Sequence, residues 1–395
     1  MKVGFLFNHE QVHQVLHSAP VAFEISRLYP DIEVRLIISS DAQHEVLSDL
    51  ARDYPGQSCR WVRIYLPRQI GRLSTLVSGC IPVEKVAMLK TNVSRFADLD
   101  ALVVTEKTSL LLKKHPELSR IQFIHTRHGA GDRAIGFNPE SSEFDLVLLS
   151  GEKIRDRLLA AGQLREGQFA MTGYIKFDAI RARQGTPLNL FENERPTVLY
   201  NPHFSPELSS WYRFGNDILE YFYHSRKFNL IFAPHVMLFE KYLHASLNNW
   251  RVRAPGTIRK KYHDCSHIHI DTHSPLSTDM SYTLAADLYL GDVSSQVYEF
   301  LIQPRPCVFA NPGVKGWKND PNYLCWQFGP VFDRVEKLDE CLEAGFKTHQ
   351  QYLPIQKLNF AYTFDDSQDN AALRSAHAII EFMQKTAHGS AKPAF

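Results

Sequence analysis

The stretch 287–299 combines residue types that can bind an anion. Its apolar residues 288–290 predict a short buried strand, and Asp292 lies in the turn that ends this strand. Ser294 or Ser295 can cap a following helix, whose free backbone N–H groups attract negative charge. The stretch therefore predicts a phosphate site, although an ordinary serine-capped turn between a strand and a helix would have the same sequence.

A second group of reactive residue types follows a predicted strand at 121–124. Here His125, Arg127, His128 and Gly129 stand almost side by side in the chain. Glycine lets the backbone approach a ligand, and histidine can exchange a proton near neutral pH. The pattern indicates acid–base chemistry at the carboxyl end of a strand. The alternative is a tight turn with His125 buried in the core.

Two Pro-His pairs provide possible donors for the same anion. His203 follows a predicted strand at 197–200, and His235 follows one at 229–232. Because the carboxyl ends of parallel strands meet at one edge of a sheet, we expect both histidines to lie near the serines of the first stretch. As hydrogen-bond donors they could hold a diphosphate without a metal ion.

The loop after the first predicted strand, 2–7, carries His9, His13 and His17. In a doubly wound fold this loop points into the ligand crevice, so these histidines could face an acceptor substrate. We favour the simpler interpretation of a solvated loop, because histidine is common on protein surfaces.

Four further histidines, His263, His267, His269 and His273, raise the question of a metal ion. The stretch 266–271 alternates apolar and polar residues, which is typical of a half-exposed strand. No cysteine or carboxylate completes a convincing tetrahedral set around these histidines. We therefore predict neither a metal ion nor a cofactor.

The segment 60–90 mixes arginine and lysine with bulky apolar residues. Such a segment can lie on an anionic membrane or bind a lipid-linked acceptor. The alternative, which we favour, is a strand and a helix that pack on the core and leave a solvated basic edge.

Size and composition exclude several classes of protein. A chain of 395 residues fits two domains, and 44% hydrophobic with 22% charged residues is typical of globular proteins. The formal charge of +1 gives no field that would steer the molecule to nucleic acid. The N-terminal apolar run is too short for a signal peptide, and no later window could span a bilayer. We expect a cytoplasmic protein, with the inner face of the membrane as a further location.

Strands and helices alternate in two series, which predicts an α/β fold of two Rossmann-like domains. The polar stretch 181–196 separates the two series. We expect an N-terminal domain at 1–180 and a C-terminal domain at 196–368. A last helix within 369–395 should pack back toward the N-terminal domain.

The order of these motifs resembles that of the CDP-glycerol glycerophosphotransferase family, the teichoic-acid-type polymerases. The matching segments are His128-Gly129, Thr172-Gly-Tyr-Ile-Lys-Phe-Asp178, the strand-Pro segment 200–203, Pro234-His235 and Asp292-Val-Ser-Ser295. The similarity covers roughly 121–333. Ile175 and Lys176 replace a proline and an arginine of the family pattern, and no tryptophan precedes His128.

The resemblance implies a GT-B fold, in which two Rossmann-like domains face a central cleft. It implies a CDP-, CMP- or UDP-linked donor on the second domain and a polymer or lipid-linked acceptor on the first, with His128 as the catalytic base. The residues implied to bind the nucleotide or its phosphates are Gly173, Lys176, His203, His235, Asp292, Ser294, Ser295 and Glu299. Those implied on the acceptor side are His17, His125, Arg127 and Gly129.

The function implied is the metal-independent transfer of a glycerophosphate or a sugar to an acceptor hydroxyl, in the synthesis of a cell-surface polysaccharide or teichoic-acid-type polymer. The same architecture serves other reactions. The alternatives are a nucleotide-sugar glycosyltransferase of capsule or lipopolysaccharide assembly, a UDP-N-acetylglucosamine 2-epimerase-like enzyme, and a non-catalytic nucleotide-sugar-binding protein.

Overall fold

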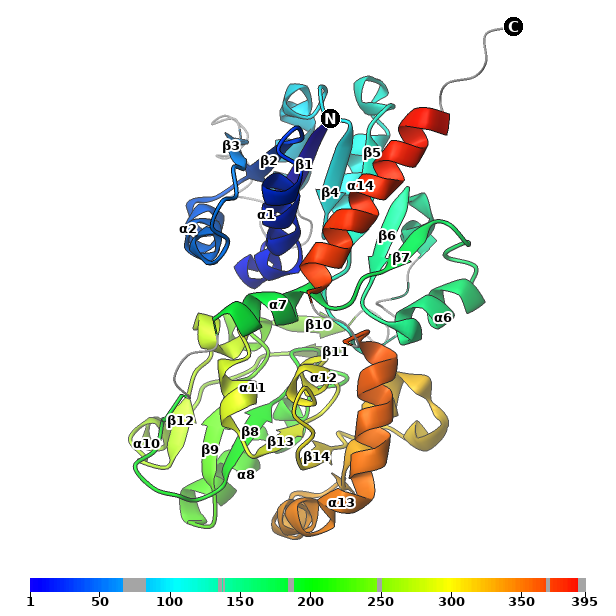
Figure 1. Cartoon of the computed structure of the whole chain (residues 1–395). Helices are drawn as coiled ribbons and strands as arrows, with labels where there is room; N and C mark the ends of the chain where they lie inside the picture. The colour runs from blue at the N-terminus through cyan, green and yellow to red at the C-terminus, as the bar shows by residue number, and fades with distance from the viewer. Residues whose placement is uncertain are drawn as a thin grey trace, which may run out of the picture. The chain divides into compact units, whose positions relative to one another are not determined.

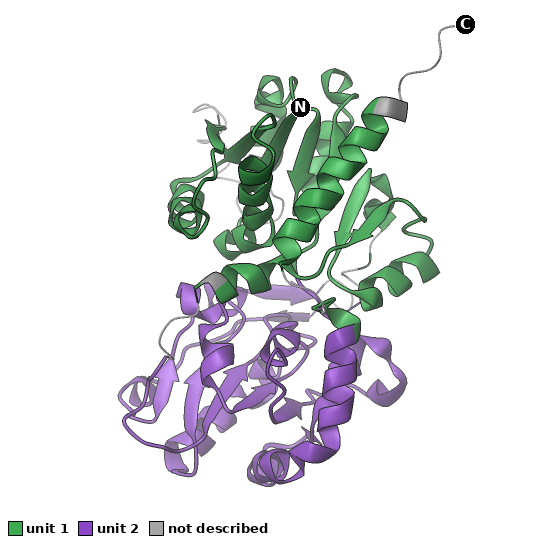
Figure 2. Cartoon of the chain, in the orientation of Figure 1, with its two compact units in different colours: residues 1–128, 137–183, 362–395 green, residues 129–136, 184–361 purple. Residues whose placement is uncertain are grey.

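The computed structural model describes residues 1–66, 83–133, 137, 139–183, 188–246, 251–366 and 370–389. The chain forms two compact units, which have separate colours in Figure 2. Unit 1 comprises residues 1–128, 137–183 and 362–395, and unit 2 comprises residues 129–136 and 184–361. This division differs from the expected boundaries of 1–180 and 196–368, because the segment directly after His128 belongs to unit 2 and the chain returns to unit 1 at residue 362.

Unit 1 is built on a parallel sheet. Its described strands lie in the order β3-β2-β1-β4-β5-β6-β7, and every neighbouring pair is parallel. The central strands are buried on both faces, which explains their nearly unbroken apolar sequences. The strands are β1 (Lys2–Phe7), β2 (Glu33–Ile38), β3 (Arg60–Arg63), β4 (Ala101–Val104), β5 (Gln122–Thr126), β6 (Leu146–Leu149) and β7 (Phe169–Met171).

The helices of unit 1 include one from the far end of the chain. Helix α14 packs along α1, as Figure 1 shows. Asp178 on α7 caps its first turn, because the Asp178 Oδ2 accepts the N–H of Ala372 at 2.7 Å. The described helices are α1 (Ala19–Leu28), α2 (Asp41–Leu50), α4 (Val83–Thr91), α5 (Leu110–Lys113), α6 (Glu152–Ala160), α7 (Ile175–Ala182) and α14 (Ala371–Gly389).

Unit 2 repeats the same plan. Its main sheet has the order β12-β9-β8-β13-β14-β15, and all of its pairs are parallel. The strands are β8 (Thr197–Asn201), β9 (Asn229–Phe232), β12 (Ile268–Ile270), β13 (Leu288–Gly291), β14 (Cys307–Ala310) and β15 (Val331–Phe332). The helices are α8 (Trp211–His224), α9 (Met237–Glu240), α10 (Lys260–His263), α11 (Ser281–Ala285), α12 (Gln296–Phe300) and α13 (Leu338–Thr363). A separate antiparallel ribbon consists of β10 (His244–Ser246) and β11 (Arg251–Arg253).

Each sheet reverses its order of construction beside its first strand. In unit 1 the reversal lies between β1 and β4, and in unit 2 it lies between β8 and β13. Ligands of open α/β sheets bind at the carboxyl ends of the strands at such a point. We therefore expect the functional site of each unit among the residues that directly follow β1 and β4 in unit 1, and β8 and β13 in unit 2.

The strands with the strongest apolar runs match the sequence expectations, and several irregular segments do not. The residues that follow β8 do not enter a helix at once, because α8 begins only at Trp211. The loop 8–17, which we interpreted as solvated, instead contains a 3₁₀ helix, Val12–His17, and buries both His9 and His17.

The basic segment 60–90 is only partly described, because residues 67–82 lie outside the described part of the chain. Arg60 pairs with Glu33 at 3.4 Å and Arg63 pairs with Asp41 at 2.5 Å. A membrane role of this segment stays a prediction. Among the described residues, no helix is both long enough and apolar enough to cross a bilayer.

Gly173 should be required for packing in unit 1. Its φ is +84°, and a Cβ there would overlap the Arg374 guanidinium and lie 2.8 Å from the carbonyl oxygen of Asp365. Gly162 is a matched control, since its φ is +64° but nothing lies within 4 Å of an added Cβ. Gly162→Ala should cost about 1 kcal/mol of left-handed strain, whereas Gly173→Ala should cost about 2–4 kcal/mol. Urea unfolding measures both, and equal losses would contradict the packing role.

Candidate functional site

Thr105, directly after β4, organises three imidazoles in unit 1. Its carbonyl oxygen accepts hydrogen bonds from His125 Nε2 at 3.2 Å and from His128 Nδ1 at 3.1 Å. Its hydroxyl bonds to His9 Nε2 at 2.5 Å. Since His9 follows β1 and Thr105 follows β4, these contacts lie at the reversal point of the sheet. Thr105 cannot be recognised from the sequence, because its side chain alone suggests no chemistry.

The bond from His128 to Thr105 fixes the state of a candidate base. A carbonyl can only accept, so Nδ1 carries the proton and the neutral ring keeps its lone pair on Nε2. The surrounding protein lowers the pKa of His128, and the charges of Arg127 and Lys107 lower it further, while the bond to Thr105 opposes this shift. The side chain remains exposed to solvent. His128 therefore presents an unprotonated, accessible nitrogen at neutral pH.

His125 and His17 are held more deeply than His128. The His125 ring is buried and stacks on Phe144, with ring centroids 4.4 Å apart. The His17 ring lies 6.3 Å from the His128 ring and 5.3 Å from that of Tyr174. Burial lowers the pKa of both histidines well below the usual value. Both rings are therefore uncharged at neutral pH in the neighbourhood of His128.

Three further residues that were expected at the site, Arg127, Lys176 and Gly173, also lie in unit 1. The Arg127 guanidinium lies 5.7 Å from the ring of Phe137, and burial lowers its pKa to about 10. Lys176 is buried on α7, where its charge contributes to the lowered pKa of His17. Gly173 and Lys176, which were expected to bind phosphate, both belong to unit 1 and lie apart in sequence from the histidines of unit 2.

In unit 2 the two Pro-His pairs adopt the same local arrangement. The Nδ1 of His203 accepts the N–H of Ser205 at 3.0 Å, and the Nδ1 of His235 accepts the N–H of Met237 at 3.3 Å. In each neutral ring the proton therefore lies on Nε2. Burial lowers the pKa of both rings, that of His235 to about 4. Their centroids are 5.3 Å apart, so two N–H donors stand together after β8 and β9.

Arg133 faces one of these donors. Its Nη1 lies 3.1 Å from His203 Nε2. Arginine never accepts a hydrogen bond, and a neutral histidine that accepts through Nδ1 carries its hydrogen on Nε2. Two donors thus lie in contact, and an anion bound beside them, with an oxygen that accepts from both, would satisfy them. Arg133 was not among the residues expected from the sequence, although it stands shortly after the glycines of the His128 loop.

Asp132 holds Arg133 in this position. Its Oδ1 accepts the hydroxyl of Tyr298 on α12 at 2.6 Å, and its Oδ2 accepts the N–H of Cys325 at 3.0 Å. Asp132 is buried, so these two bonds fix the loop firmly. The chain passes directly from His128, the last residue of the first segment of unit 1, into this loop.

Asp292 has a positioning role. Its carboxylate accepts the N–H of His203 at 3.0 Å, the N–H of Ser210 at 2.7 Å and the Ser210 hydroxyl at 2.9 Å. Burial raises its pKa to about 6. A carboxylate whose oxygens already accept several donors would repel a phosphate. Asp292 therefore sets the position of His203, and its expected contact with the ligand stays a prediction.

Ser294 and Ser295 precede helix α12, and the Ser294 hydroxyl accepts the N–H of Gln296, the first residue of the helix, at 3.4 Å. Helix α12 has only five residues, and the Ser295 side chain makes no capping bond. A Cβ on Gly131 would lie 3.2 Å from that of Ser295, so the glycine loop covers this helix start. Glu299 is buried within α12. The candidate anion donors that lie together in unit 2 are Arg133, His203 and His235, and a phosphate role of Ser294 and Ser295 stays a prediction.

Comparison with solved structures identifies the architecture. A structure of the wall teichoic acid polymerase TagF soaked with CDPG matches with a TM-score of 0.59 and 15% identity, over 98% of this chain and 89% of that chain. A putative UDP-N-acetylglucosamine 2-epimerase from Listeria monocytogenes matches with a TM-score of 0.60 and 12% identity, over 100% and 98%. A UDP-GlcNAc 2-epimerase from Neisseria meningitidis bound to UDP-GlcNAc matches with 0.55 and 13%, over 98% and 100%. The chain has the GT-B fold.

The GT-B assignment confirms the expected fold class and, at the level of the fold, the resemblance to teichoic-acid polymerases. No protein-family model and no curated protein matches the sequence. These identities establish the fold alone. The reaction has to be argued from the residues of the two GT-B units.

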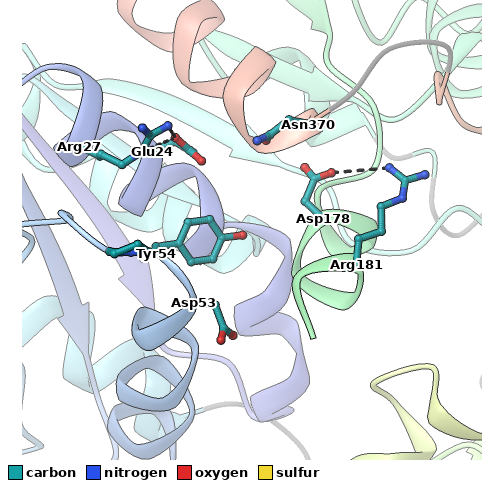
Figure 3. Close-up of a pocket in the computed structure, with 8 residues that line it drawn as sticks. Glu24, Arg27, Asp53, Tyr54, Asp178, Arg181 and Asn370 are labelled. Carbon is teal, nitrogen blue, oxygen red and sulfur yellow. Dashed lines mark hydrogen bonds and ion pairs between the residues drawn. The ribbon is translucent and has the colours of Figure 1, made fainter. Parts of the chain in front are cut away.

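A pocket of unit 1 is lined by residues other than Thr105 and the three histidines that bond to it. Figure 3 shows its lining by side chains of α1, α7 and the segment 53–55, and its volume is about 470 Å³. Its charged groups have partners: Arg27 contacts Glu24 at 2.6 Å, Arg181 lies 3.9 Å from Asp178, and Asp53 accepts from Arg183 at 2.6 Å. The pocket thus offers a ligand little uncompensated charge.

No group of three or more metal-ligating side chains occurs within the described part of the chain. Metal independence of the GT-B protein stays a prediction, because ligands can come from a substrate as well as from the protein.

The tautomers of the histidines give a direct test of both sites. In ¹⁵N-labelled protein at neutral pH, His128 should carry its proton on Nδ1, whereas His203 and His235 should carry theirs on Nε2. Long-range imidazole correlation spectra distinguish the two forms, and single His→Gln variants assign the signals. If His203 proved to be protonated on Nδ1, Arg133 could donate to its Nε2, and the argument for an anion beside them would fail.

Proposed function

We propose that this protein is a GT-B transferase of cell-surface polysaccharide or teichoic-acid-type polymer synthesis. It moves a glycerophosphate or a sugar from a nucleotide-activated donor to the hydroxyl of a polymer or lipid-linked acceptor. One observation carries the proposal: Arg133 and the Nε2–H of His203 face each other in unit 2, at the strand ends where GT-B-like sheets bind ligands.

In this proposal unit 2 binds the diphosphate of the donor. Arg133 and His203 donate to one phosphate from two directions, and His235 provides a third N–H beside them. Charged and oriented donors stabilise the negative charge that grows on the leaving phosphate, in place of a metal ion. Asp292 and Asp132 hold these donors in position from behind.

Unit 1 supplies the base. His128 Nε2 takes the proton of the acceptor hydroxyl while the oxygen attacks the donor. Attack at phosphorus transfers glycerophosphate and releases CMP, and attack at an anomeric carbon transfers a sugar and releases the nucleoside diphosphate. The lowered pKa of His128 keeps the base unprotonated at neutral pH.

The runner-up is a UDP-GlcNAc 2-epimerase-like reaction, which the structural likeness to two such proteins favours. It would act on the donor alone. A protein that binds a nucleotide sugar without turnover is the third candidate. Transfer is preferred because the candidate base is an exposed histidine in unit 1, and the positive charges of Arg127 and Lys107, which lower its pKa, suit an anionic acceptor.

Loss of Arg133 should weaken binding of a nucleoside diphosphate. Arg133→Ala and His235→Ala should each cost about 1.5–3 kcal/mol of binding free energy, because each removes a hydrogen bond to a charged group. Arg259→Ala is the control, since Arg259 is exposed in the same unit and pairs with Glu220 at 3.7 Å. Calorimetry with CDP and UDP in EDTA measures the affinities. Unchanged affinity in Arg133→Ala would contradict the phosphate site, and no binding at all of wild type in EDTA would contradict metal independence.

Loss of His128 should separate turnover from binding. His128→Ala should lower the turnover number by about 10²-fold to 10⁴-fold and leave calorimetric affinity for the nucleotide unchanged. His44→Ala, which removes an exposed histidine of unit 1, is the control. The assay supplies CDP-glycerol or UDP-GlcNAc with and without acceptor. Donor consumption that requires acceptor supports transfer, isomerisation without acceptor supports the epimerase, and binding without turnover supports the non-catalytic protein.

A further inference from the structure

A pocket of unit 2 lies at the amino-terminal ends of β8 and β9. Thr197 and Asn229 are the first residues of these parallel strands, pair with each other across them and line the pocket. Its volume is about 320 Å³, and pockets for small molecules measure about 300–1,000 Å³. His203 and His235 follow the other ends of the same strands, and a strand of five residues spans about 16 Å. The pocket is therefore separate from the candidate phosphate site.

The residues that line this pocket are uncharged. Among the described lining residues none is ionisable, whereas carboxylates and arginines line the pocket of unit 1. Leu190 and Phe191 represent the apolar part of the lining, and its polar part includes Asn189, Asn193 and Asn229. An ion would leave water here without a charged partner, which is unfavourable. The ligand that fits such a lining is neutral.

Asn229 brings a buried acceptor to the pocket. The residue is 1% exposed. Its Nδ2 donates to the carbonyl of Arg195 at 3.0 Å, which assigns the orientation of the amide. Its Oδ1 has no hydrogen-bond partner within the described part of the chain. Leaving a buried acceptor unsatisfied is costly, so a donor group of a ligand in the pocket would find a strong partner in this oxygen.

The two other asparagines bring donors. The Oδ1 of Asn189 accepts the N–H of Phe191 at 3.4 Å, and the Oδ1 of Asn193 accepts the N–H of Arg195 at 3.1 Å. Both side chains thus use their oxygens in Asx turns, and neither Nδ2 donates to another described residue. An amide nitrogen is a donor only. The pocket therefore combines one acceptor with two donors and an apolar wall.

We propose that this pocket binds an uncharged sugar, and that an acetamido sugar matches it best. A sugar hydroxyl donates to the Oδ1 of Asn229, the acetamido carbonyl accepts from Asn189 or Asn193, and the acetamido methyl packs against the apolar wall. A free sugar and the end of a glycan share this chemistry. The proposal does not rest on the transfer reaction.

A nucleobase is a poorer match for the same pocket. It would also offer donors and acceptors, but it gains much of its binding free energy from stacking on aromatic rings. Phe191 is the only aromatic residue of the described lining. Sugar hydroxyls both donate and accept, so they suit the three amide side chains better than a flat ring does.

Saturation-transfer NMR titration of the full chain tests the proposal. N-acetylglucosamine should bind with a dissociation constant of about 1 mM, as expected for a ligand of its size. Asn229→Ala and Asn189→Ala each remove one hydrogen-bonding group and should lower the affinity by about 3-fold to 10-fold. Ala285→Leu should abolish binding, because Ala285 lines the pocket at the end of α11 and a larger side chain there would fill it.

Two matched controls should bind the sugar like wild type. Asn216→Ala removes an exposed asparagine of unit 2, and Ala344→Leu enlarges an alanine of α13 that is as partly exposed as Ala285. Thermal unfolding without sugar shows that each variant is folded. Arg133→Ala should also bind the sugar like wild type, which separates this site from the candidate phosphate site.

Three results would overturn the sugar site: wild type without saturable binding of N-acetylglucosamine, a folded Ala285→Leu variant that binds like wild type, and wild type that binds uridine but no sugar. Tighter binding of the disaccharide N,N′-diacetylchitobiose would identify a glycan as the source of the sugar, and equal binding would identify the free sugar. Either source supports the proposal.

Discussion

The candidate phosphate site of unit 2 depends on one buried carboxylate. Asp292 follows β13, and its oxygens reach the backbone of His203, which follows β8, and the backbone and hydroxyl of Ser210. These bonds join the two strand ends at which the sheet reverses its order. Hydrogen bonds to a charged group are worth about 1.5–3 kcal/mol each, and such a buried carboxylate would be costly without them. The backbone of His203, and with it the position of its imidazole at the end of the sheet, is consequently fixed.

In unit 1, neutral groups join the two strand ends at the reversal of the sheet and orient the histidine. There Thr105 joins the ends of β1 and β4 through its bond to His9, and its carbonyl orients His128. The difference suits the two proposed roles. A base needs an imidazole with an open lone pair, which a carbonyl partner on Nδ1 provides, whereas a phosphate ligand needs an imidazole with an outward N–H, which a backbone N–H partner on Nδ1 provides.

The sequence predicts the sheets well because parallel strands buried on both faces need long apolar runs, and few other structures place such runs between glycine and proline residues. It also predicts which residue types form the site, because polar residues that follow parallel strands gather at the same edge of the sheet. The sequence does not predict the hydrogen-bond partners that orient these site residues. Thr105 acts through its carbonyl, which every residue has, and Arg133 becomes significant only because Asp132 is anchored by Tyr298 and Cys325, far away in the chain. Nor does it predict that Gly131, distant in sequence, lies against Ser295.

The return of the chain to unit 1 has a consequence for the order of synthesis. Helix α14 contributes buried residues such as Ala372, Ala376 and Ile379, and it packs along α1, which leaves the ribosome first. Residues 184–361 must be made before that helix exists. Until then the apolar surface of α1 that α14 covers stays open, and unit 2 can complete its fold before unit 1.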